Sequence, residues 1–287
     1  MGRAMALNLQ ERSFAVTVAD ADAAAIAFFG QKWPLVCEFT HLYAMKIAVI
    51  IAVVDAEQIR QVLFGEPSDG SQAHHGLADR LCAGSVVVIT STIGPGDLAN
   101  FAAELRERGI HTLDAPISGG PAKARDASMS LMLAGDREAV KSTSALLQAL
   151  SQHIQPMGER LGDASAAKLI NNALAAVHLY NHCCDLMAAE AIELELAAVN
   201  RLVAASSGQS WIGNDRMARQ LAGNFEPTAR MALLAKDSAL AMAMLRRKNL
   251  PAQWSQPAAD CIAAACAAGL AYSDDSALIA YLRKLAR

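Results

Sequence analysis

The sequence predicts an α/β domain followed by an all-helical domain. Up to about residue 160, short β-branched runs alternate with stretches that carry apolar residues at helical spacing. After residue 162 no run is typical of a strand. The 287 residues, 53% hydrophobic and 18% charged, suit roughly two folded domains rather than a disordered chain. We therefore predict domains over residues 1–161 and 162–287.

The first domain contains five predicted strands and three predicted helices. The strands are expected at Phe14–Val18, Ile47–Val54, Ser85–Thr90, His111–Ala115 and Ser130–Ala134. The helices are expected at Ala56–Phe64, Pro95–Arg108 and Arg137–Leu150, with Pro95 at a first turn where its missing N–H does no harm. Every residue of Ile47–Val54 is apolar, which predicts a fully buried strand. Such runs separated by helices are typical of a parallel sheet covered on both faces.

The second domain opens with a long helical pattern. Asp163–Leu196 is rich in Ala and Leu and contains neither Pro nor Gly, so we predict one continuous helix. Glycines and prolines separate the helices that follow. A helix this long and alanine-rich also favours packing against a second subunit, which predicts a homodimer or homotetramer.

Charge and composition exclude several classes of protein. The 25 Lys and Arg residues against 28 Asp and Glu give a net charge of −3, without the basic excess that tracks nucleic-acid phosphates. The longest apolar run, Ile47–Val54, is far shorter than the ~20 residues that span a bilayer. Six cysteines without a CxxC pair are expected to be reduced thiols. We expect a cytoplasmic protein that binds neither nucleic acid nor membrane.

The chain begins inside a recognisable motif. Gly2 opens a helical stretch, and Asp20 follows the next predicted strand. In a dinucleotide-binding βαβ unit, the last glycine of G-x-G-x-x-G starts the helix, and an acidic residue ~20 positions on binds the adenosine ribose. Gly2 and Asp20 fit the second half of that motif. The first strand and two glycines would lie upstream of Met1, in the middle of the sheet, so we expect the natural protein to start about ten residues earlier.

Further motifs follow one another in a fixed order. They are Ser91–Pro95 (STIGP), Asp114–Gly120 (DAPISGG), Lys168–Asn172 (KLINN), Lys236-Asp237 and Asp275-Ser276-Ala277. Together they resemble the β-hydroxyacid dehydrogenase family, the 3-hydroxyisobutyrate dehydrogenase-like enzymes, over essentially the whole chain. The resemblance implies an α/β Rossmann-type dinucleotide-binding domain, a 6-phosphogluconate dehydrogenase-like all-α domain and a nicotinamide cofactor.

Lys168 and Asn172 are the predicted catalytic pair. They are four residues apart and so project from one face of the helix. An enzyme that removes hydride from a hydroxy acid needs a group that takes the hydroxyl proton, and a desolvated lysine can do this. The apolar neighbours of Lys168 suit that role, whereas local sequence alone favours a solvated lysine and asparagine on the surface of the helix. The resemblance implies that Lys168 is the acid/base and that Asn172 holds the substrate or the lysine.

Ser118, Gly119 and Gly120 follow a predicted strand, where ligands of α/β proteins bind. Two glycines allow a close approach of backbone N–H groups and the serine adds a hydroxyl, a suitable cradle for a carboxylate. A flexible turn is the alternative. By resemblance these residues bind the substrate carboxylate, with Ser118 also taking part in catalysis. The charged, glycine-free segment Pro121–Asp126 departs from the family pattern.

The resemblance also implies residues that contact the cofactor and the substrate. The predicted cofactor contacts are Gly2, Arg3, Ala4, Asp20, Val53, Val54, Thr92 and Lys236, and the predicted further substrate contact is Arg216. Asp20 would repel a 2′-phosphate and Ala21 offers no cation, so NAD is expected in preference to NADP. His178 and His182 have a spacing found in metal sites, but no third ligand is identifiable, so no metal is predicted.

These observations predict an NAD-dependent dehydrogenase that oxidises the hydroxyl group of a small, 3-hydroxyisobutyrate-like 3-hydroxy acid. Two alternatives within the family are a semialdehyde reductase and a dehydrogenase of sugar acids of the threonate type. A third alternative is a non-catalytic relative with a defective cofactor loop.

Overall fold

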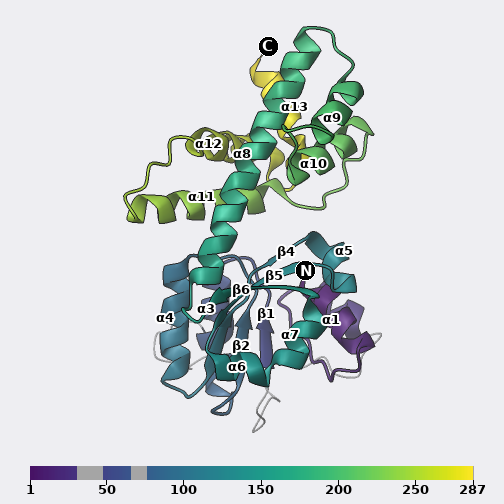
Figure 1. The fold of residues 1–287 in the computed structure, drawn as a ribbon. Coiled ribbons are helices and arrows are strands. Elements are labelled where there is room, and N and C mark those ends of the chain that lie inside the picture. Colours follow the sequence, from purple (N-terminus) through teal and green to yellow (C-terminus); the bar gives the residue numbers. More distant parts are fainter. Residues whose placement is uncertain (31–47, 66–75, 287) are drawn as a thin grey trace. The chain divides into compact units, whose positions relative to one another are not determined.

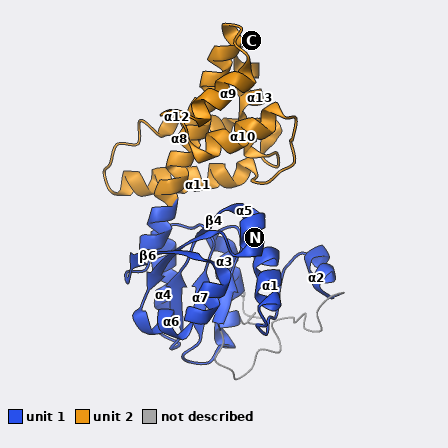
Figure 2. Ribbon diagram, turned by 45° about the vertical axis from the view of Figure 1, so that its right-hand side comes forward, with its two compact units in different colours: residues 1–168 blue, residues 169–287 orange. Residues whose placement is uncertain are grey.

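A computed structural model describes residues 1–30, 48–65 and 76–286. The chain forms two compact units, residues Met1–Lys168 and Leu169–Arg287 (Figures 1 and 2). The first unit is built around a sheet and the second is helical, as the sequence predicts. The division between them falls inside one helix, α8 (Asp163–Ala191), which begins in the first unit and continues into the second.

The first unit contains a six-stranded sheet in the order β1-β2-β3-β5-β4, with β6 on the other side of β5. Its strands are β1 (Ala48–Ile51), β2 (Val86–Ile89), β3 (His111–Asp114), β4 (Ile117–Ser118), β5 (Ser130–Gly135) and β6 (His153–Gly158). The run β1-β2-β3 is parallel, but β5 is antiparallel to both β3 and β4. The sheet is therefore mixed and not parallel throughout as predicted, because the chain reverses its direction between β4 and β5, in the connection that contains residues Gly120–Asp126 of helix α5.

Two strand predictions need correction. Residues Phe14–Val18 form no strand, although their side chains alternate between half-buried and exposed and Val18 lies in a single β-bridge. A regular strand needs a neighbour to pair its backbone groups, and no named strand of the described chain pairs with this segment. Of the strand predicted at Ile47–Val54, Ala48–Ile51 forms β1, and Ile47 lies outside the described residues. Within β1 only Ile51 is buried, because β2 is the one described neighbour of β1.

Helices cover both faces of the sheet, as predicted (Figure 1). Val86 and Val88 of β2 face one core, whereas Val87 and Ile89 face the other. The first core is completed by α1 (Gly2–Glu11), α5 (Gly120–Asp126), α6 (Arg137–Ser142) and α7 (Ser144–Leu150), and the second by α3 (Ala56–Phe64), η2 (Leu77–Asp79) and α4 (Pro95–Arg106). A further helix is α2 (Ala23–Gly30). The alternation of side chains along β2 thus fixes which helices lie on which face.

The helix predicted at Arg137–Leu150 is divided into α6 and α7. The break lies at Thr143, whose Oγ1 hydroxyl donates a 2.7 Å hydrogen bond to the carbonyl oxygen of Ala139. Such a bond from a threonine side chain to the preceding turn often bends a helix.

The long helix also ends earlier than predicted. Helix α8 stops at Ala191 rather than Leu196, since Glu193 takes a left-handed conformation at φ 60°. The N–H of Leu194 then reaches back to the carbonyl of Ala189, the pattern that commonly closes a helix at a glycine. Because a glutamate occupies the glycine position, the sequence carries no signal for this end.

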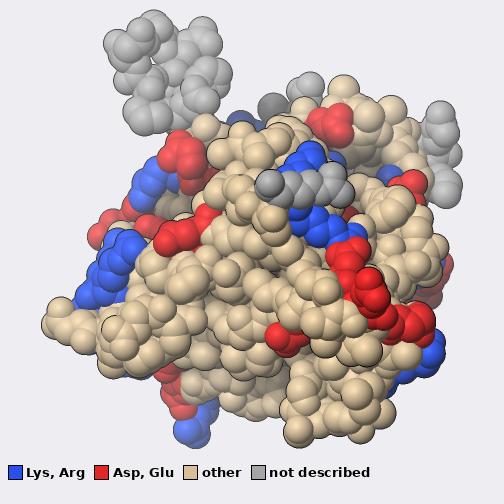
Figure 3. Space-filling model, turned by 90° about the horizontal axis from the view of Figure 1, so that it is seen from above, with Lys and Arg blue, Asp and Glu red and all other residues tan. Residues whose placement is uncertain are grey.

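The helical unit continues with α9 (Leu196–Ala204), α10 (Trp211–Leu221), α11 (Met231–Arg247), α12 (Gln256–Ala265), η3 (Cys266–Leu270), η4 (Asp275–Ala277) and α13 (Leu278–Leu285). Its main core joins residues of α8, α10, α11, α12 and α13. None of the helices in the described part of the chain is long and apolar enough to cross a membrane. Figure 3 shows one face of the molecule, on which basic and acidic side chains lie intermixed.

A close contact joins α8 to α10. The buried His182 ring hydrogen-bonds through Nε2 to Asn200 Oδ1 at 3.0 Å, and its Nδ1 lies against Gly213. A Cβ atom on Gly213 would come within 2.3 Å of His182 Nδ1 and 2.8 Å of Ser210 Oγ. Burial lowers the pKa of His182, so the neutral ring is the form that fits this contact.

We expect Gly213→Ala to destabilise the helical unit by about 1–3 kcal/mol, because the methyl group overpacks a buried junction. Urea denaturation followed by circular dichroism measures this loss. Gly208→Ala is the matched control, since its Cβ would meet only Val203 Cγ1 at 3.8 Å. Equal stability of the two variants would contradict the contact.

Candidate functional site

Four of the predicted contact residues follow the three parallel strands. Val53 and Val54 come after β1, Thr92 after β2 and Ser118 lies just beyond β3. Because the carboxyl ends of parallel strands meet at one edge of a sheet, these residues share that edge. Val53 and Thr92 are half-buried, whereas Val54 is exposed. The first unit therefore gathers the predicted cofactor and substrate residues of its loops on the side where α/β proteins bind ligands.

The start of α1 lies at the same edge. A Cβ atom on Gly2 would be 3.5 Å from the Cβ of Ala52, just after β1. No side chain caps this helix, and its first turn holds no acidic residue. Helix N-termini of this kind attract phosphate groups through their N–H groups. Gly2 and Ala4 thus lie where a dinucleotide pyrophosphate fits, while Arg3 stacks on the ring of Phe28 at 4.8 Å.

Two polar side chains, those of Ser91 and Asp20, suit a dinucleotide bound at this edge. The Ser91 hydroxyl, beside Thr92, is buried with no hydrogen-bond partner in the described structure, so it is suited to a polar ligand. Asp20 is exposed, and its Oδ1 accepts a 3.0 Å hydrogen bond from the N–H of Asp22. The second carboxylate oxygen suits a ribose hydroxyl. Both residues are compatible with a nicotinamide dinucleotide.

The loop at Ser118 requires its first glycine. Gly119 has φ 133°, and a Cβ atom there would lie 2.9 Å from Lys123 Cδ and 3.3 Å from Met129 Cα. Gly120 has φ 79° and begins α5. All three loop residues are half-buried. Gly119 is therefore required by the packing of this loop against Lys123 and Met129, whereas a Cβ atom on Gly120 would meet nothing within 4 Å, which leaves the backbone there open to a ligand.

Lys168 is buried, with 6% of its surface exposed, near the start of α8. Asn172 lies one turn later on the same helix face. The Nδ2 group of Asn172 donates a 2.7 Å hydrogen bond to Asp237 Oδ2, and Asn172 Oδ1 accepts from Asn171 at 3.0 Å. Both contacts fix the orientation of the Asn172 amide.

Lys236 reaches the same carboxylate in the second unit. Its Nζ lies 2.8 Å from Asp237 Oδ1, so Asp237 joins Lys236 of α11 to Asn172 of α8. The Lys236-Asp237 pair is visible in the sequence, but the sequence predicts no role for the aspartate. A role was not foreseen because the pairing with Asn172 spans 65 residues of sequence.

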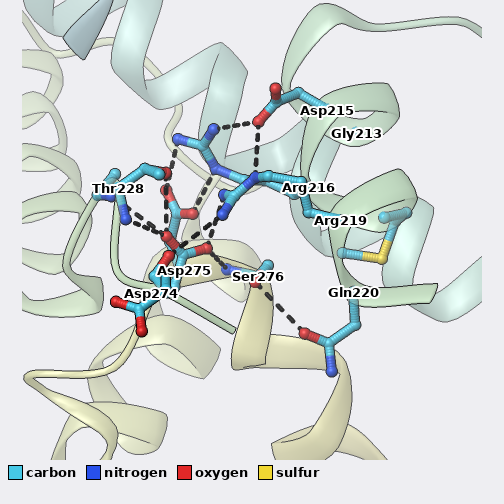
Figure 4. Close-up of polar contacts among 12 residues, drawn as sticks. Gly213, Asp215, Arg216, Arg219, Gln220, Thr228, Asp274, Asp275 and Ser276 are labelled. Atoms are coloured by element: carbon cyan, nitrogen blue, oxygen red, sulfur yellow. Dashed lines mark hydrogen bonds and ion pairs between the residues drawn. The ribbon is translucent and has the colours of Figure 1, made fainter. Parts of the chain in front are cut away.

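Arg216 lies in a buried ion-pair network (Figure 4). Its Nε and Nη2 donate to Asp275 at 2.5 and 3.3 Å, and its Nη1 donates to Asp215 at 2.5 Å. Arg219 binds both Asp215 and Asp274. The predicted substrate contact of Arg216 stays a prediction. Its guanidinium already has carboxylate partners, which gives Arg216 a role in holding α10 to the segment around η4.

Two of the three aspartates in this network, Asp274 and Asp275, have opposite pKa shifts. Burial raises the pKa of Asp275 to about 6, and the Arg216 guanidinium opposes that rise. Burial also opposes ionisation of Asp274, but hydrogen bonds from Ser276, Thr228 and Arg219 together hold its pKa well below its usual range. Asp274 is thus the firmly charged member, and Asp275 depends on Arg216 for its charge.

Other candidate residues have structural partners. His182 pairs with Asn200, and the described residues contain no group of three or more His, Cys, Asp or Glu side chains that could hold a metal ion. The five cysteines in the described ranges are free thiols. Burial raises the pKa of Cys183 to a value at which the thiol stays protonated at neutral pH.

Two family profiles match the chain. The NAD-binding domain of 6-phosphogluconate dehydrogenase matches residues 1–158. The profile described as NAD-binding of NADP-dependent 3-hydroxyisobutyrate dehydrogenase matches residues 162–282. Together the two profiles cover nearly the whole chain.

Individual relatives agree with these profiles. The chain is 31% identical to the L-threonate dehydrogenases of Pectobacterium atrosepticum and Haemophilus influenzae, in each case over 81% of this chain and 74% of the relative. It is also similar to the crystal structure of a 3-hydroxyisobutyrate dehydrogenase from Salmonella typhimurium, with a TM-score of 0.84 and 27% identity, over 97% of this chain and 95% of that one.

We expect Arg216→Leu to lower the unfolding free energy by about 3–5 kcal/mol, because it leaves the Asp275 carboxylate buried without its main cationic partner. Thermal denaturation measures the loss. The control is Arg201→Leu, which breaks an exposed pair with Glu195 and should cost less than about 1 kcal/mol. An Arg216 variant with normal stability but a raised KM for the hydroxy acid would instead support the substrate contact.

Proposed function

Since this chain belongs to the 3-hydroxyisobutyrate dehydrogenase-like β-hydroxyacid dehydrogenase family, we propose that it oxidises a hydroxyl group of a small polyhydroxy acid of the L-threonate type, with NAD as cofactor. The identity to two L-threonate dehydrogenases carries this choice of substrate class. It favours the sugar-acid alternative over the 3-hydroxyisobutyrate-like substrate. The similarity to a 3-hydroxyisobutyrate dehydrogenase structure supports the latter as the second candidate.

Ser118, Gly119 and Gly120 would bind the substrate carboxylate. The hydroxyl of Ser118 can donate a hydrogen bond, and the backbone at Gly120 is open to close approach, since a Cβ atom there would meet nothing within 4 Å. Donors of this kind suit a carboxylate better than an uncharged group. Binding the carboxylate at a fixed loop would hold the neighbouring hydroxyl carbon in place for reaction.

Lys168 would take the proton of the substrate hydroxyl. Only 6% of the surface of the Lys168 residue is exposed, which suits a side chain whose neutral amine must take a proton from substrate rather than from solvent. Asn172 would donate or accept a hydrogen bond with the same hydroxyl. The bond from Asn172 Nδ2 to Asp237 keeps that amide in one orientation, so Asp237 supports the site without touching substrate.

The nicotinamide dinucleotide would be held by the predicted cofactor contacts, which are Gly2, Arg3, Ala4, Asp20, Val53, Val54, Thr92 and Lys236. When bound, this cofactor supplies the acceptor for hydride. The α1 N-terminus suits the pyrophosphate, and the exposed Asp20 carboxylate suits the ribose hydroxyls. The negative charge of Asp20 disfavours a 2′-phosphate, so the proposal includes a preference for NAD.

The proposal also includes self-association and a cytoplasmic location. Ile170 and Leu174 on α8 expose 60% and 54% of their surface. Apolar side chains at this spacing on one helix face commonly pack against a partner helix. A homodimer or homotetramer would cover them.

A panel of hydroxy acids tests the substrate and cofactor together. L-threonate and 3-hydroxyisobutyrate are assayed with NAD and NADP by the absorbance of the reduced nicotinamide. We expect the highest kcat/KM with L-threonate and NAD, and we expect Asp20→Ser to narrow the gap between NAD and NADP. Equal use of both cofactors by the unmodified protein would show that other residues form the ribose pocket.

We expect Lys168→Ala to lower kcat by about 10²- to 10⁴-fold with little change in NADH affinity, because the proton acceptor is lost while the cofactor contacts remain. Lys168→Arg should not restore activity, since a guanidinium stays protonated. Steady-state kinetics and NADH fluorescence titration measure the two quantities. The control is Lys141→Ala on α6, which should keep normal turnover. Near-normal turnover of Lys168→Ala would rule out the assigned role.

A further inference from the structure

Strand β3 ends in a carboxylate that is wholly inside the first unit. Asp114 is 0% exposed, and its backbone is paired with Ile89 of β2 on one side and Ala134 of β5 on the other. A side chain at this position in the sheet has little freedom to move. Its carboxylate is therefore a fixed reference point at the carboxyl edge of the sheet.

That carboxylate binds the start of α8. Asp114 Oδ2 accepts hydrogen bonds from the N–H groups of Gly162 at 3.0 Å and Ser165 at 2.9 Å, and Oδ1 accepts from the Ser165 hydroxyl at 2.7 Å. These donors are among the N–H groups that a helix start leaves without internal partners. A negative charge at this end is also favoured by the helix dipole.

The cap differs from the others in the same unit. Asp55 and Asp136 each precede the helix that they cap and accept one backbone N–H, at 2.9 Å. Asp114, in contrast, is 51 residues away from Ser165 in sequence. A local cap stabilises its own helix, whereas this long-range cap also fixes the position of α8 relative to the sheet.

A second contact holds the same helix end. A Cβ atom on Gly162, at φ 98°, would lie 3.1 Å from Pro95 Cβ and 3.2 Å from the Pro95 carbonyl oxygen. The start of α8 is thus packed directly against the first turn of α4. With the Asp114 bonds, this contact restrains both the position and the direction of the first helical turn.

Two parts of the proposed site are connected directly to this cap. Lys168 follows Ser165 by one helical turn, on the same face of α8. In the other direction, Asp114 leads through Ala115 and Pro116 into β4 and the loop of Ser118, Gly119 and Gly120. The Asp114 carboxylate is therefore connected both to the helix that carries Lys168 and to the loop proposed to bind the substrate carboxylate.

We propose that Asp114, through its bonds to Gly162 and Ser165, is a positioning residue that sets the place of Lys168 relative to the Ser118–Gly120 loop. The inference rests on the proposed role of Lys168. It assigns Asp114 and Ser165 no contact with substrate or cofactor. Misplacing a reacting group by about 1 Å can cost about 10²-fold in rate, so a cap that holds Lys168 in place affects turnover strongly.

The test measures Asp114→Asn, Ser165→Ala and the double variant with L-threonate and NAD. Turnover is expressed per NADH-binding site, so that unfolded protein does not count. We expect kcat to fall by about 3- to 10-fold for Ser165→Ala and about 10- to 100-fold for Asp114→Asn, with NADH affinity within about twofold of normal. The double variant should be no slower than Asp114→Asn, because both changes break one set of bonds.

A pH profile separates positioning from stability. In Ser165→Ala the carboxylate charge is kept but the start of α8 is looser. We expect the acidic limb of the kcat profile to move to higher pH, because water that reaches the proton acceptor favours its protonated form. Lower stability alone would leave this limb unchanged.

Asp136→Asn is the matched control, since it weakens the cap of α6 without touching α8. It should lower the melting temperature but keep kcat and the pH profile. If Lys168→Ala is inactive while Ser165→Ala and Asp114→Asn keep normal turnover and the normal limb, the positioning role is overturned and the proposed function stands. If Lys168→Ala is active, the proposed function itself fails. Ser165→Ala decides the question even where Asp114→Asn does not fold.

Discussion

The arrangement of the first unit depends on the hydrogen bonds that the buried carboxylate of Asp114 accepts. A carboxylate inside a protein is costly unless strong donors satisfy it. Burial raises the pKa of Asp114, while the Ser165 hydroxyl and the backbone N–H groups at the start of α8 oppose that rise. The sheet and the helix therefore satisfy each other: β3 supplies the acceptor that the helix end lacks, and the helix end supplies the donors that the acid needs.

The helical unit meets the same constraint with a different solution. Asp274 and Asp275 are both almost fully buried, and they are satisfied by Arg219 and Arg216 together with backbone N–H groups around Thr228. Losing one member of such a network leaves a charge without a partner, which costs far more than losing an exposed ion pair. The Asp275-Ser276-Ala277 motif thus has a clear role in the fold of this unit, whatever its further role in function.

The carboxyl edge of the sheet explains why the cofactor motifs occur where they do. In the parallel run β1-β2-β3 each strand delivers its following loop to the same side, so Val53, Thr92 and Ser118 come together although they are far apart in sequence. The reversal at β5 adds the neighbour that buries Asp114. The mixed sheet and the cap of α8 are therefore parts of one arrangement.

Sequence by itself determined the elements whose signal is local. The β-branched apolar runs located β2, β3 and β5, the helical spacing located α3, and the ordered motifs identified the family and the face shared by Lys168 and Asn172. Tertiary structure decided what depends on distant partners. Phe14–Val18 has the alternation of a strand but no described strand to pair with, and the direction of β5 depends on the connection through α5 rather than on its apolar run. The ion pairs of Arg216 and the cap formed by Asp114 are not visible in the sequence, because they are contacts across 59 and 48 to 51 residues. Local sequence patterns show which face of a helix or strand is buried. The partner of a buried charge can lie far away in the sequence, so only the folded structure identifies it.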